Sequence, residues 1–353
     1  MPARVVLTFG GVDVHGINRA LRPSGPGTAS CAVLRLALCQ LGWYLRIFGI
    51  SPFLSHVLAR HRHFRWMTPT IRAPGMPRTA LLLVLALAIA CGRSGSRVGA
   101  PAYEVYAVRY GTLERFPVAA LVAGADTSRR ADIALMVWLA RTPGRTVLVD
   151  AGFYRDKFMR RWRPAAYERP SAAIARVGLR PEDVTDIVIS HVHWDHLDGA
   201  DLFPRARLWI QRAEYEYYVD STGRARSGTI DSLDAAMLAD LARAGRVELI
   251  PGDSIEIIPG ITVFTGGKHT YASQYASVRT DRGVVVIASD NAYLYENLDQ
   301  RRPITQTLDS LSNLRAQDRM HRLAANRSLV VPGHDPAVFA RFPAPGSGVA
   351  RIR

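Results

Sequence analysis

Cysteine is scarce in this chain of 353 residues, and its distribution limits how the protein can be stabilised. The three cysteines are Cys31, Cys39 and Cys91, so residues 92–353 contain none. A disulfide framework is therefore excluded for that long segment. A closed structural zinc finger is disfavoured as well, because such sites rely on cysteine thiolates. The composition, 48% hydrophobic and 21% charged, is ordinary for a globular protein that can bury a sizeable core.

Acidic residues are almost missing from the first 75 positions, where Asp13 is the single acid against nine arginines. That segment carries +8 of the formal charge of +15, which leaves +7 for residues 76–353. The remainder has no dense run of lysine and arginine interleaved with aromatic residues. The charge pattern therefore argues against nucleic acid as a partner.

Residues 76–92 contain an apolar run that is too short for a membrane anchor. The stretch 80–90 is short of the roughly 20 residues that cross a bilayer core. It follows a basic start at Met76 and ends at small residues, so residues 76–91 are predicted to be a signal peptide. The end, Leu87-Ala88-Ile89-Ala90-Cys91, is similar to the lipobox of bacterial lipoproteins, in which the cysteine is acylated. Because Ala88 stands where leucine is usual, ordinary signal cleavage stays open as an alternative.

A signal peptide normally stands at the start of a chain, whereas the predicted one begins at residue 76. We therefore predict that translation starts at Met76 and that residues 1–75 are an upstream extension outside the functional protein. The alternative is a membrane-associated extension, although three polar residues interrupt the apolar stretch 34–54 and make it a poor spanning helix. Residues 92–102 begin with Gly, Ser and Arg and are predicted to be a flexible tether. We therefore expect an exported protein, either periplasmic or held at a membrane by a lipid on Cys91.

From about Tyr103 onward, short β-type runs alternate with helical patterns. The predicted strands are 104–108, 133–139, 146–149, 186–189, 207–211, 261–264, 284–288 and 329–331. The predicted helices include 171–177, 213–219, 232–244 and 307–325. This mixture predicts an α/β layered domain over residues 103–353, in which sheet and helices share one core.

Three imidazoles and a carboxylate occupy six consecutive positions directly after the apolar run 187–189. They are His191, His193, Asp195 and His196. Imidazole and carboxylate ligands together suit zinc and its first-row neighbours. The cluster therefore predicts an open, catalytic metal site in preference to a histidine-rich surface loop.

Further polar residues stand at the ends of other predicted strands, where ligands converge on one edge of a sheet. Asp150 and Asp290 come just after two of these strands, and His269 and His334 follow two more. The joint pattern predicts two divalent cations that acidify a bridging water, and hence hydrolysis. The predicted ligands are His191, His193 and His269 for one cation, Asp195, His196 and His334 for the other, and Asp290 bridging both.

The pattern resembles the metallo-β-lactamase superfamily and, within it, the N-acyl-homoserine lactonase-like group, from about Tyr103 to Phe339. The superfamily motifs are His191-x-His193-x-Asp195-His196, His269, Asp290 and Pro332-Gly333-His334-Asp335. The segments 147–152 (VLVDAG), 211–215 (QRAEY) and 290–293 (DNAY) also match. The spacing Asp290-x-x-Tyr293 and the triplet Gly333-His334-Asp335 point to the lactonase-like branch.

The resemblance implies a four-layer αββα sandwich with two divalent metal ions, expected to be Zn²⁺, at one edge of the sheets. It implies that Tyr293 lies beside the metals and hydrogen-bonds the substrate carbonyl or the developing alkoxide; the alternative is an ordinary packed aromatic. Asp150 is implied to organise the site loops rather than to bind metal. Asp198 and His321 receive no role, and His321 is expected on a solvated helix face.

The loop before the third metal ligand departs from the family pattern. Lactonase-like relatives usually carry Thr-Pro-Gly-His-Thr-Pro-Gly-His there, whereas this chain reads TGGKHTYASQ over residues 265–274. An extra residue precedes His269, and Ser273 replaces the second histidine. The ligand survives, but the loop shape and its substrate contacts are open. Lys268 either attracts an anionic substrate group or faces solvent, and the solvent reading is favoured.

The expected function is a metal-dependent hydrolase that opens a lactone or cleaves a related small-molecule ester. A hydroxide bridging two zinc ions would attack the carbonyl, Tyr293 would steady the oxygen, and Asp195 would relay the proton to the leaving oxygen. The alternatives are another hydrolase of this fold, acting on a β-lactam, a thioester, or a phosphodiester or sulfate ester. A non-catalytic metal-binding surface lipoprotein is the alternative from a different class.

Overall fold

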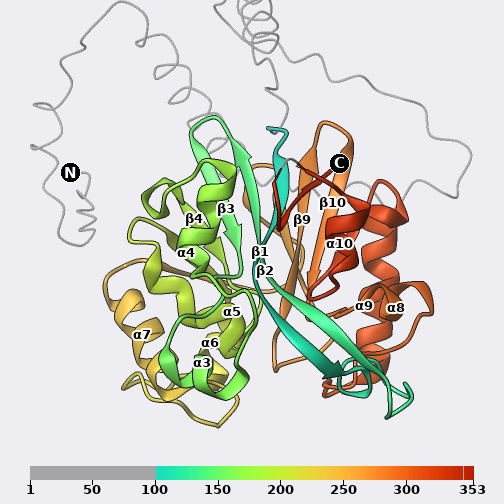
Figure 1. Cartoon of the computed structure of the whole chain (residues 1–353). Helices are drawn as coiled ribbons and strands as arrows, with labels where there is room; N and C mark the ends of the chain where they lie inside the picture. The colour runs from blue at the N-terminus through green and yellow to red at the C-terminus, as the bar shows by residue number, and fades with distance from the viewer. Residues whose placement is uncertain (1–100, 345) are drawn as a thin grey trace, which may run out of the picture. The chain divides into compact units, whose positions relative to one another are not determined.

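Two β-sheets lie face to face at the centre of the domain (Figure 1). The computed structural model describes residues 101–344 and 346–353. The first sheet has the strand order β12-β1-β2-β3-β4-β5-β6, and the second has the order β11-β10-β9-β8-β7. The strands are β1 (Glu104–Pro117), β2 (Arg130–Thr142), β3 (Arg145–Val149), β4 (Asp186–Val188), β5 (Arg207–Gln211), β6 (Val247–Ile250), β7 (Ile255–Ile258), β8 (Ile261–Thr265), β9 (Gln274–Thr280), β10 (Gly283–Ser289), β11 (Val330–Pro332) and β12 (Val349–Ile352).

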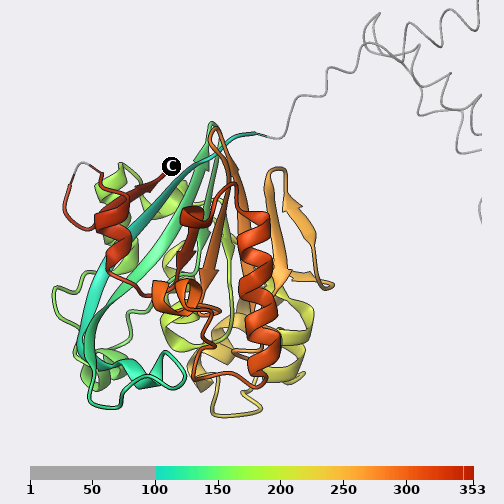
Figure 2. The same ribbon diagram turned by 90° about the vertical axis from the view of Figure 1, so that its right-hand side faces the viewer.

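Helices cover the outer face of each sheet, which confirms the predicted αββα sandwich (Figures 1 and 2). The first sheet is covered by α3 (Asp156–Trp162), α4 (Pro170–Ala173), α5 (Trp194–Leu197), α6 (Arg212–Tyr218) and α7 (Ser232–Arg243). The second sheet is covered by α8 (Tyr295–Asp299), α9 (Ser310–Leu323) and α10 (Ala337–Arg341). Short 3-10 helices lie at Val118–Ala120, Ile174–Val177, Pro181–Asp183, Asp198–Leu202 and Arg327–Leu329.

The inner strand β2 shows why the sheet is covered on both faces. Its residues 133–140 are all buried, so the sequence reads as a continuous apolar run. Ile133 and Leu135 point toward the helices on the outer face, while Met136 and Trp138 point toward the second sheet. Successive side chains of a strand point to opposite faces, so a strand whose residues are all apolar must be covered on both faces. The run therefore requires one layer on each face of the sheet.

The prediction of a single shared core is wrong, because the apolar side chains form two clusters. One cluster lies between the first sheet and helices such as α7, and it includes Leu238. The other fills the space between the two sheets and continues under α9, where it includes Met320. A sheet covered on both faces separates its alternate side chains into two layers, so it divides the core.

The predicted elements are all present, but several boundaries differ. The helix predicted over 171–177 is a short α-helix followed by a 3-10 turn. The helix predicted from residue 307 begins at Ser310, because Asp309 caps it by accepting a hydrogen bond from the Ser312 N–H at 3.0 Å. The structure adds elements that were not predicted: β6, β7, β9, β12, α3, α5, α8 and α10.

Several predictions concern residues outside the described part of the chain. The upstream extension, the signal peptide, the acylated Cys91 and most of the tether all fall within residues 1–100. Among residues 101–344 and 346–353, no helix combines the length and the apolar character needed to cross a membrane.

Gly199 provides a test of the close packing between the 3-10 helix Asp198–Leu202 and the loop after β3. Its N–H donates to the Gly152 carbonyl at 2.8 Å, and a Cβ here would sit far inside contact distance of the Ala151 carbonyl oxygen. We expect Gly199→Ala to lower the free energy of unfolding by about 1–3 kcal/mol, measured by urea denaturation. Gly228→Ala is the matched control, since nothing lies within 4 Å of a Cβ there. Equal stability of the two variants would contradict this account.

Candidate metal centre

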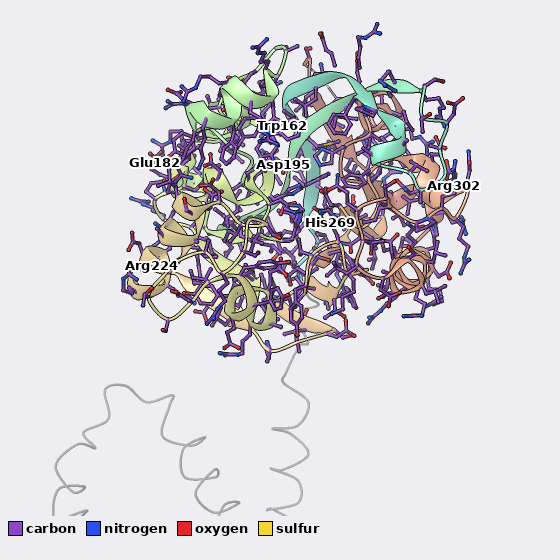
Figure 3. All side chains as sticks on the ribbon, turned by 90° about the horizontal axis from the view of Figure 1, so that it is seen from below. Trp162, Glu182, Asp195, Arg224, His269 and Arg302 are labelled. Carbon is purple, nitrogen blue, oxygen red and sulfur yellow. The ribbon has the colours of Figure 1, made fainter. Side chains whose placement is uncertain are left out.

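Loops that follow strand ends meet at one edge of the two sheets. The first sheet contributes the loops after β3 and β4, and the second contributes the loops after β8, β10 and β11. The last three carry His269, Asp290 and His334. Seen from below, Asp195 and His269 lie near the middle of this edge (Figure 3). The predicted convergence of polar residues at strand ends is therefore observed.

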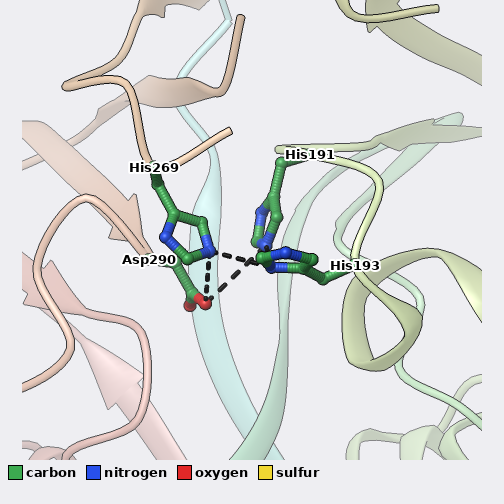
Figure 4. Close-up of side chains that lie close together, drawn as sticks. All are labelled: His191, His193, His269 and Asp290. Atoms are coloured by element: carbon green, nitrogen blue, oxygen red, sulfur yellow. Dashed lines mark hydrogen bonds and ion pairs between the residues drawn. The ribbon is translucent and has the colours of Figure 1, made fainter. Parts of the chain in front are cut away.

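Three histidines and one aspartate form a first cluster (Figure 4). His193 Nδ1 lies 2.9 Å from His191 Nε2 and 2.9 Å from His269 Nε2. Asp290 Oδ2 lies 3.4 Å from His269 Nε2 and 3.7 Å from His191 Nε2. One ligand atom from each residue falls within 4.8 Å of the others, which is the arrangement of a metal-binding group.

A second cluster is formed by Asp195, His196 and His334. Asp195 Oδ2 lies 3.6 Å from His196 Nε2 and 3.8 Å from His334 Nε2. The other oxygen of Asp290, Oδ1, lies 3.4 Å from His196 Nε2 and 3.0 Å from His334 Nε2. Asp290 therefore presents one carboxylate oxygen to each cluster, and all seven predicted ligands come together.

In His269 and His334, Nε2 faces the centre and Nδ1 faces away from it, and the contact of Nδ1 fixes which of the two nitrogens carries the proton. His269 Nδ1 lies 2.8 Å from the Gln306 carbonyl, and His334 Nδ1 lies 3.0 Å from the Ala134 carbonyl. A carbonyl only accepts hydrogen bonds, so each Nδ1 carries the proton. Each neutral ring then presents an unprotonated Nε2 to the centre. Such outer contacts are typical of histidines that bind metal.

Asp150 holds the second cluster from behind. Its carboxylate accepts hydrogen bonds from the Ser190 N–H, the His196 Nδ1–H and the Ser289 hydroxyl, each at 2.8 Å. Asp150 and Ser289 both have positive φ, 59° and 47°, which is costly for residues other than glycine. This strained backbone turns the carboxylate toward His196. Its position agrees with a role in organising the loops.

Burial leaves the imidazoles of the first cluster neutral. It lowers the pKa of His191 well below the ordinary histidine value, and it lowers the pKa of His193 and of His269 to about 4. Removing a charged imidazolium from water is unfavourable, and the neighbouring rings oppose a second positive charge. These three side chains therefore offer lone pairs at neutral pH, as metal ligands must.

Carboxylates dominate the second cluster. Burial is the largest single influence on His196 and His334 and would lower the pKa of each, but the negative charges of Asp290 and the other nearby carboxylates together outweigh it and raise both. His196 Nε2 and Asp290 Oδ1 are buried without a hydrogen-bond partner among the described residues. A buried carboxylate oxygen requires either a hydrogen-bond donor or positive charge beside it. A divalent cation meets that requirement without protonating the rings, so the donor set fits a metal.

Tyr293, which the resemblance places beside the metals, contacts one histidine of each cluster. Its hydroxyl is 3.5 Å from His269 Nδ1, and its ring centre is 5.8 Å from that of His334. Burial, together with the charges of Asp290 and Asp195, raises the pKa of the phenol well above its ordinary value. Tyr293 is therefore a protonated hydrogen-bond donor at neutral pH.

Two buried acids near the centre were not assigned a role from the sequence. Asp198 accepts hydrogen bonds from the Tyr154 and Arg155 N–H groups and pairs with the Arg155 guanidinium, which ties the loop after β3 to α5. Glu214 accepts hydrogen bonds from the loops on either side of the first cluster. The segment QRAEY, which contains Glu214, was the available signal.

The atypical loop before His269 is held by one backbone hydrogen bond within the segment 265–274 and by one to the side chain of Asn291. The Gly266 N–H donates to the Ser273 carbonyl at 2.6 Å, and the Gly267 N–H donates to Asn291 Oδ1 at 2.6 Å. Lys268 is half-buried as a whole, but its ammonium is exposed and donates to the Tyr271 carbonyl at 2.8 Å, which agrees with the prediction that it faces solvent. Ser273 is buried in the place of the second histidine.

His321 lies outside the centre. It is on α9, and its Nε2 lies 3.4 Å from the Leu298 carbonyl. The side chain is half-buried, so it is less solvated than the sequence suggested.

Known relatives of this chain are lactonases by name. An N-acyl homoserine lactonase of Bacillus cereus is 29% identical over 170 residues, which cover 48% of this chain and 62% of that protein. The N-acyl homoserine lactonase AttM of Azorhizobium caulinodans is 30% identical over 185 residues, which cover 50% of this chain and 67% of that protein. The chain thus spans about 60% of the length of the Bacillus relative.

Solved structures and a family model agree on the fold. A quorum-quenching N-acyl homoserine lactone lactonase has a TM-score of 0.55 at 22% identity, covering 67% of this chain and 93% of its own. An N-acyl homoserine lactone hydrolase with N-hexanoyl-L-homoserine at its catalytic metal center has a TM-score of 0.55 at 21% identity, covering 67% and 94%. The model of the metallo-beta-lactamase superfamily matches residues 134–339. With this match over more than half of its length, the chain belongs to the metallo-beta-lactamase superfamily.

Proposed function

We propose that this protein is a metallohydrolase that opens the ring of a lactone, with N-acyl-homoserine lactones and related esters as its substrate class. The observation that carries the proposal is the position of Asp290. One of its carboxylate oxygens faces His191 and His269, and the other faces His196 and His334. A carboxylate placed in this way suits a pair of divalent cations that share one ligand.

The ligands of the proposed pair are divided between the two clusters, and zinc is the expected metal because the donors are imidazole and carboxylate. The ligands are His191, His193, His269 and Asp290 for one ion, and Asp195, His196, His334 and Asp290 for the other. When bound, such ions supply a nucleophile at neutral pH and polarise a carbonyl.

The side chains around the ions divide the remaining work. Tyr293 keeps its phenolic proton, so it can donate a hydrogen bond to the oxygen on which negative charge develops. Asp195 lines the same pocket on the side of His334 and is placed to carry a proton to the leaving oxygen. Both residues line the pocket in which the scissile bond would have to lie.

The pocket over the centre supports a substrate that is polar at one end and apolar at the other. It has a volume of about 140 Å³. The polar part is lined by His193, Asp195, Asp290, Tyr293, Gln306 and His334, and the apolar part by Leu113, Phe116, Leu121, Ile133, Trp162 and Trp194. A lactone ring at the metal centre would place an acyl substituent against the apolar wall. The relatives that carry the name of N-acyl homoserine lactonase lend the same support.

A substrate panel on the metal-loaded protein tests the proposal. We expect ring opening of N-acyl-homoserine lactones and of simple γ- and δ-lactones, followed by proton release, with much slower turnover of β-lactams, thioesters and phosphodiesters. Chelation should abolish the activity, and added Zn²⁺ should restore it. Two bound metal equivalents without hydrolysis of any lactone or ester would overturn the lactonase assignment.

Asp290→Asn tests the shared ligand. The amide keeps the shape of the side chain but removes its charge and one acceptor oxygen. We expect turnover to fall by more than about 100-fold, beyond the range seen for outer partners of metal ligands, and the metal content to drop below two per chain. Asp318→Asn, a half-buried acid on α9 that pairs with Arg301 away from the centre, is the control. Full turnover with a single bound metal would argue against the shared-ligand mechanism.

Tyr293→Phe tests the hydrogen bond to the developing oxyanion. Because that hydrogen bond strengthens only as charge develops, we expect kcat to fall about 10- to 100-fold while KM changes little. Tyr295→Phe is the matched control. The Tyr295 hydroxyl is buried without a hydrogen-bond partner among the described residues, and its side chain belongs to the apolar cluster that lies between the two sheets and under α9. A Tyr293→Phe enzyme with unchanged kcat would leave Tyr293 a packing residue.

A further inference from the structure

Glu214 is a fully buried carboxylate that belongs to neither ligand cluster. It lies on α6, which begins directly after β5 at the same edge of the first sheet as the metal centre. Burying an ionised carboxylate is unfavourable unless its oxygens are well paired. Among the described residues, no lysine, arginine or histidine comes within ion-pair distance of Glu214, and the charge of Lys268 acts on it only as a minor influence from farther away. Its partners therefore have to be hydrogen-bond donors.

Those donors come from the two loops that carry the histidines of the first cluster. Oε1 accepts from the Val192 N–H at 3.3 Å and from the Thr270 hydroxyl at 2.5 Å, and Oε2 accepts from the Ala272 N–H at 2.6 Å. Val192 stands between two ligands of the first cluster, and Thr270 directly follows the third. One side chain thus joins segments separated by more than 70 residues, each of which carries part of the same site.

We propose that Glu214 is a positioning residue that sets the affinity of the first cluster for its cation, an inference that rests on the proposed metal-dependent function. The carboxylate holds Val192 and Thr270 at fixed positions, so the imidazoles on either side of them are already placed to bind. Outer contacts of this kind typically change metal affinity by 10- to 100-fold. The negative charge of Glu214 also lies near the cation that the three neutral imidazoles would hold.

The second cluster does not share this support. His196 is held by Asp150, whose other partners are Ser190 and Ser289. The centre therefore has two buried carboxylates behind its ligands. Asp150 holds His196 directly and reaches His191 through Ser190, whose hydroxyl lies 2.9 Å from His191 Nδ1, whereas the hydrogen bonds of Glu214 all go to the segments around the first-cluster histidines. Removing the charge of Glu214 should weaken one metal site selectively. General loosening of the fold would weaken both.

Zinc binding to the full-length chain tests the inference without any substrate. The metal-free protein is titrated against a chromophoric zinc chelator, and the two binding steps are assigned with His269→Ala for the first cluster and His334→Ala for the second. In Glu214→Gln, at least one of the three donors faces an amide N–H instead of an oxygen. We expect the dissociation constant of the first-cluster step to rise about 10- to 100-fold, with the other step changed less than about threefold.

Glu216→Gln is the matched control, because this acid lies two residues away on the same helix, is exposed, and contacts Arg212 on its own helix. It should leave both steps unchanged. If Glu214→Gln does not fold, Thr270→Val removes a single donor and should weaken the first-cluster step alone. Wild-type affinities in these variants, or equal weakening of both steps, would overturn the role of Glu214. A wild-type chain that binds no zinc would instead overturn the proposed function.

Discussion

The carboxylate of Asp290 stands among four imidazoles, and this concentration of buried polar atoms is the constraint on which the site depends. Each of its oxygens lies between 3.0 and 3.7 Å from two histidine nitrogens. Lone pairs and negative charge gathered in this way away from water are unfavourable unless positive charge joins them. The arrangement is therefore a site for cations. The surrounding structure has to keep these groups close together although their lone pairs and negative charges repel one another.

The fold meets this constraint by placing the ligands on loops that follow strand ends, or on the short helix α5 after β4, and by holding several of them through hydrogen bonds to their outer nitrogens. Carbonyl groups hold the outer nitrogens of His269 and His334, and Asp150 holds that of His196. Asp150 has a positive φ, an unfavourable backbone conformation, and in this conformation its carboxylate is oriented toward His196. The two core clusters on either face of the first sheet make that backbone rigid enough to sustain the strain.

The sequence predicted the ligands because each follows an apolar run that ends abruptly at a polar residue. The same logic could not find Glu214, since its role depends on contacts with Val192 and Thr270, which are 22 and 56 residues away. Strand β12 was missed because its four residues form a strand only through pairing with β1, 240 or more residues earlier in the chain. Local patterns thus identify side chains that act alone, while tertiary contacts create the roles of those that act through others.

Trp194 shows how the metal motif and the substrate wall are joined. It lies between His193 and Asp195, and its ring stacks on Trp162 at 5.2 Å and on Phe158 at 5.0 Å. Both partners belong to α3, a helix that contributes no ligand. In the proposed enzyme, changes in α3 can therefore reshape the apolar wall while the ligands keep their places. Under the proposed function, the ligand motif would set the reaction, and the packing of α3 on Trp194 would set the shape of the wall that an acyl group meets.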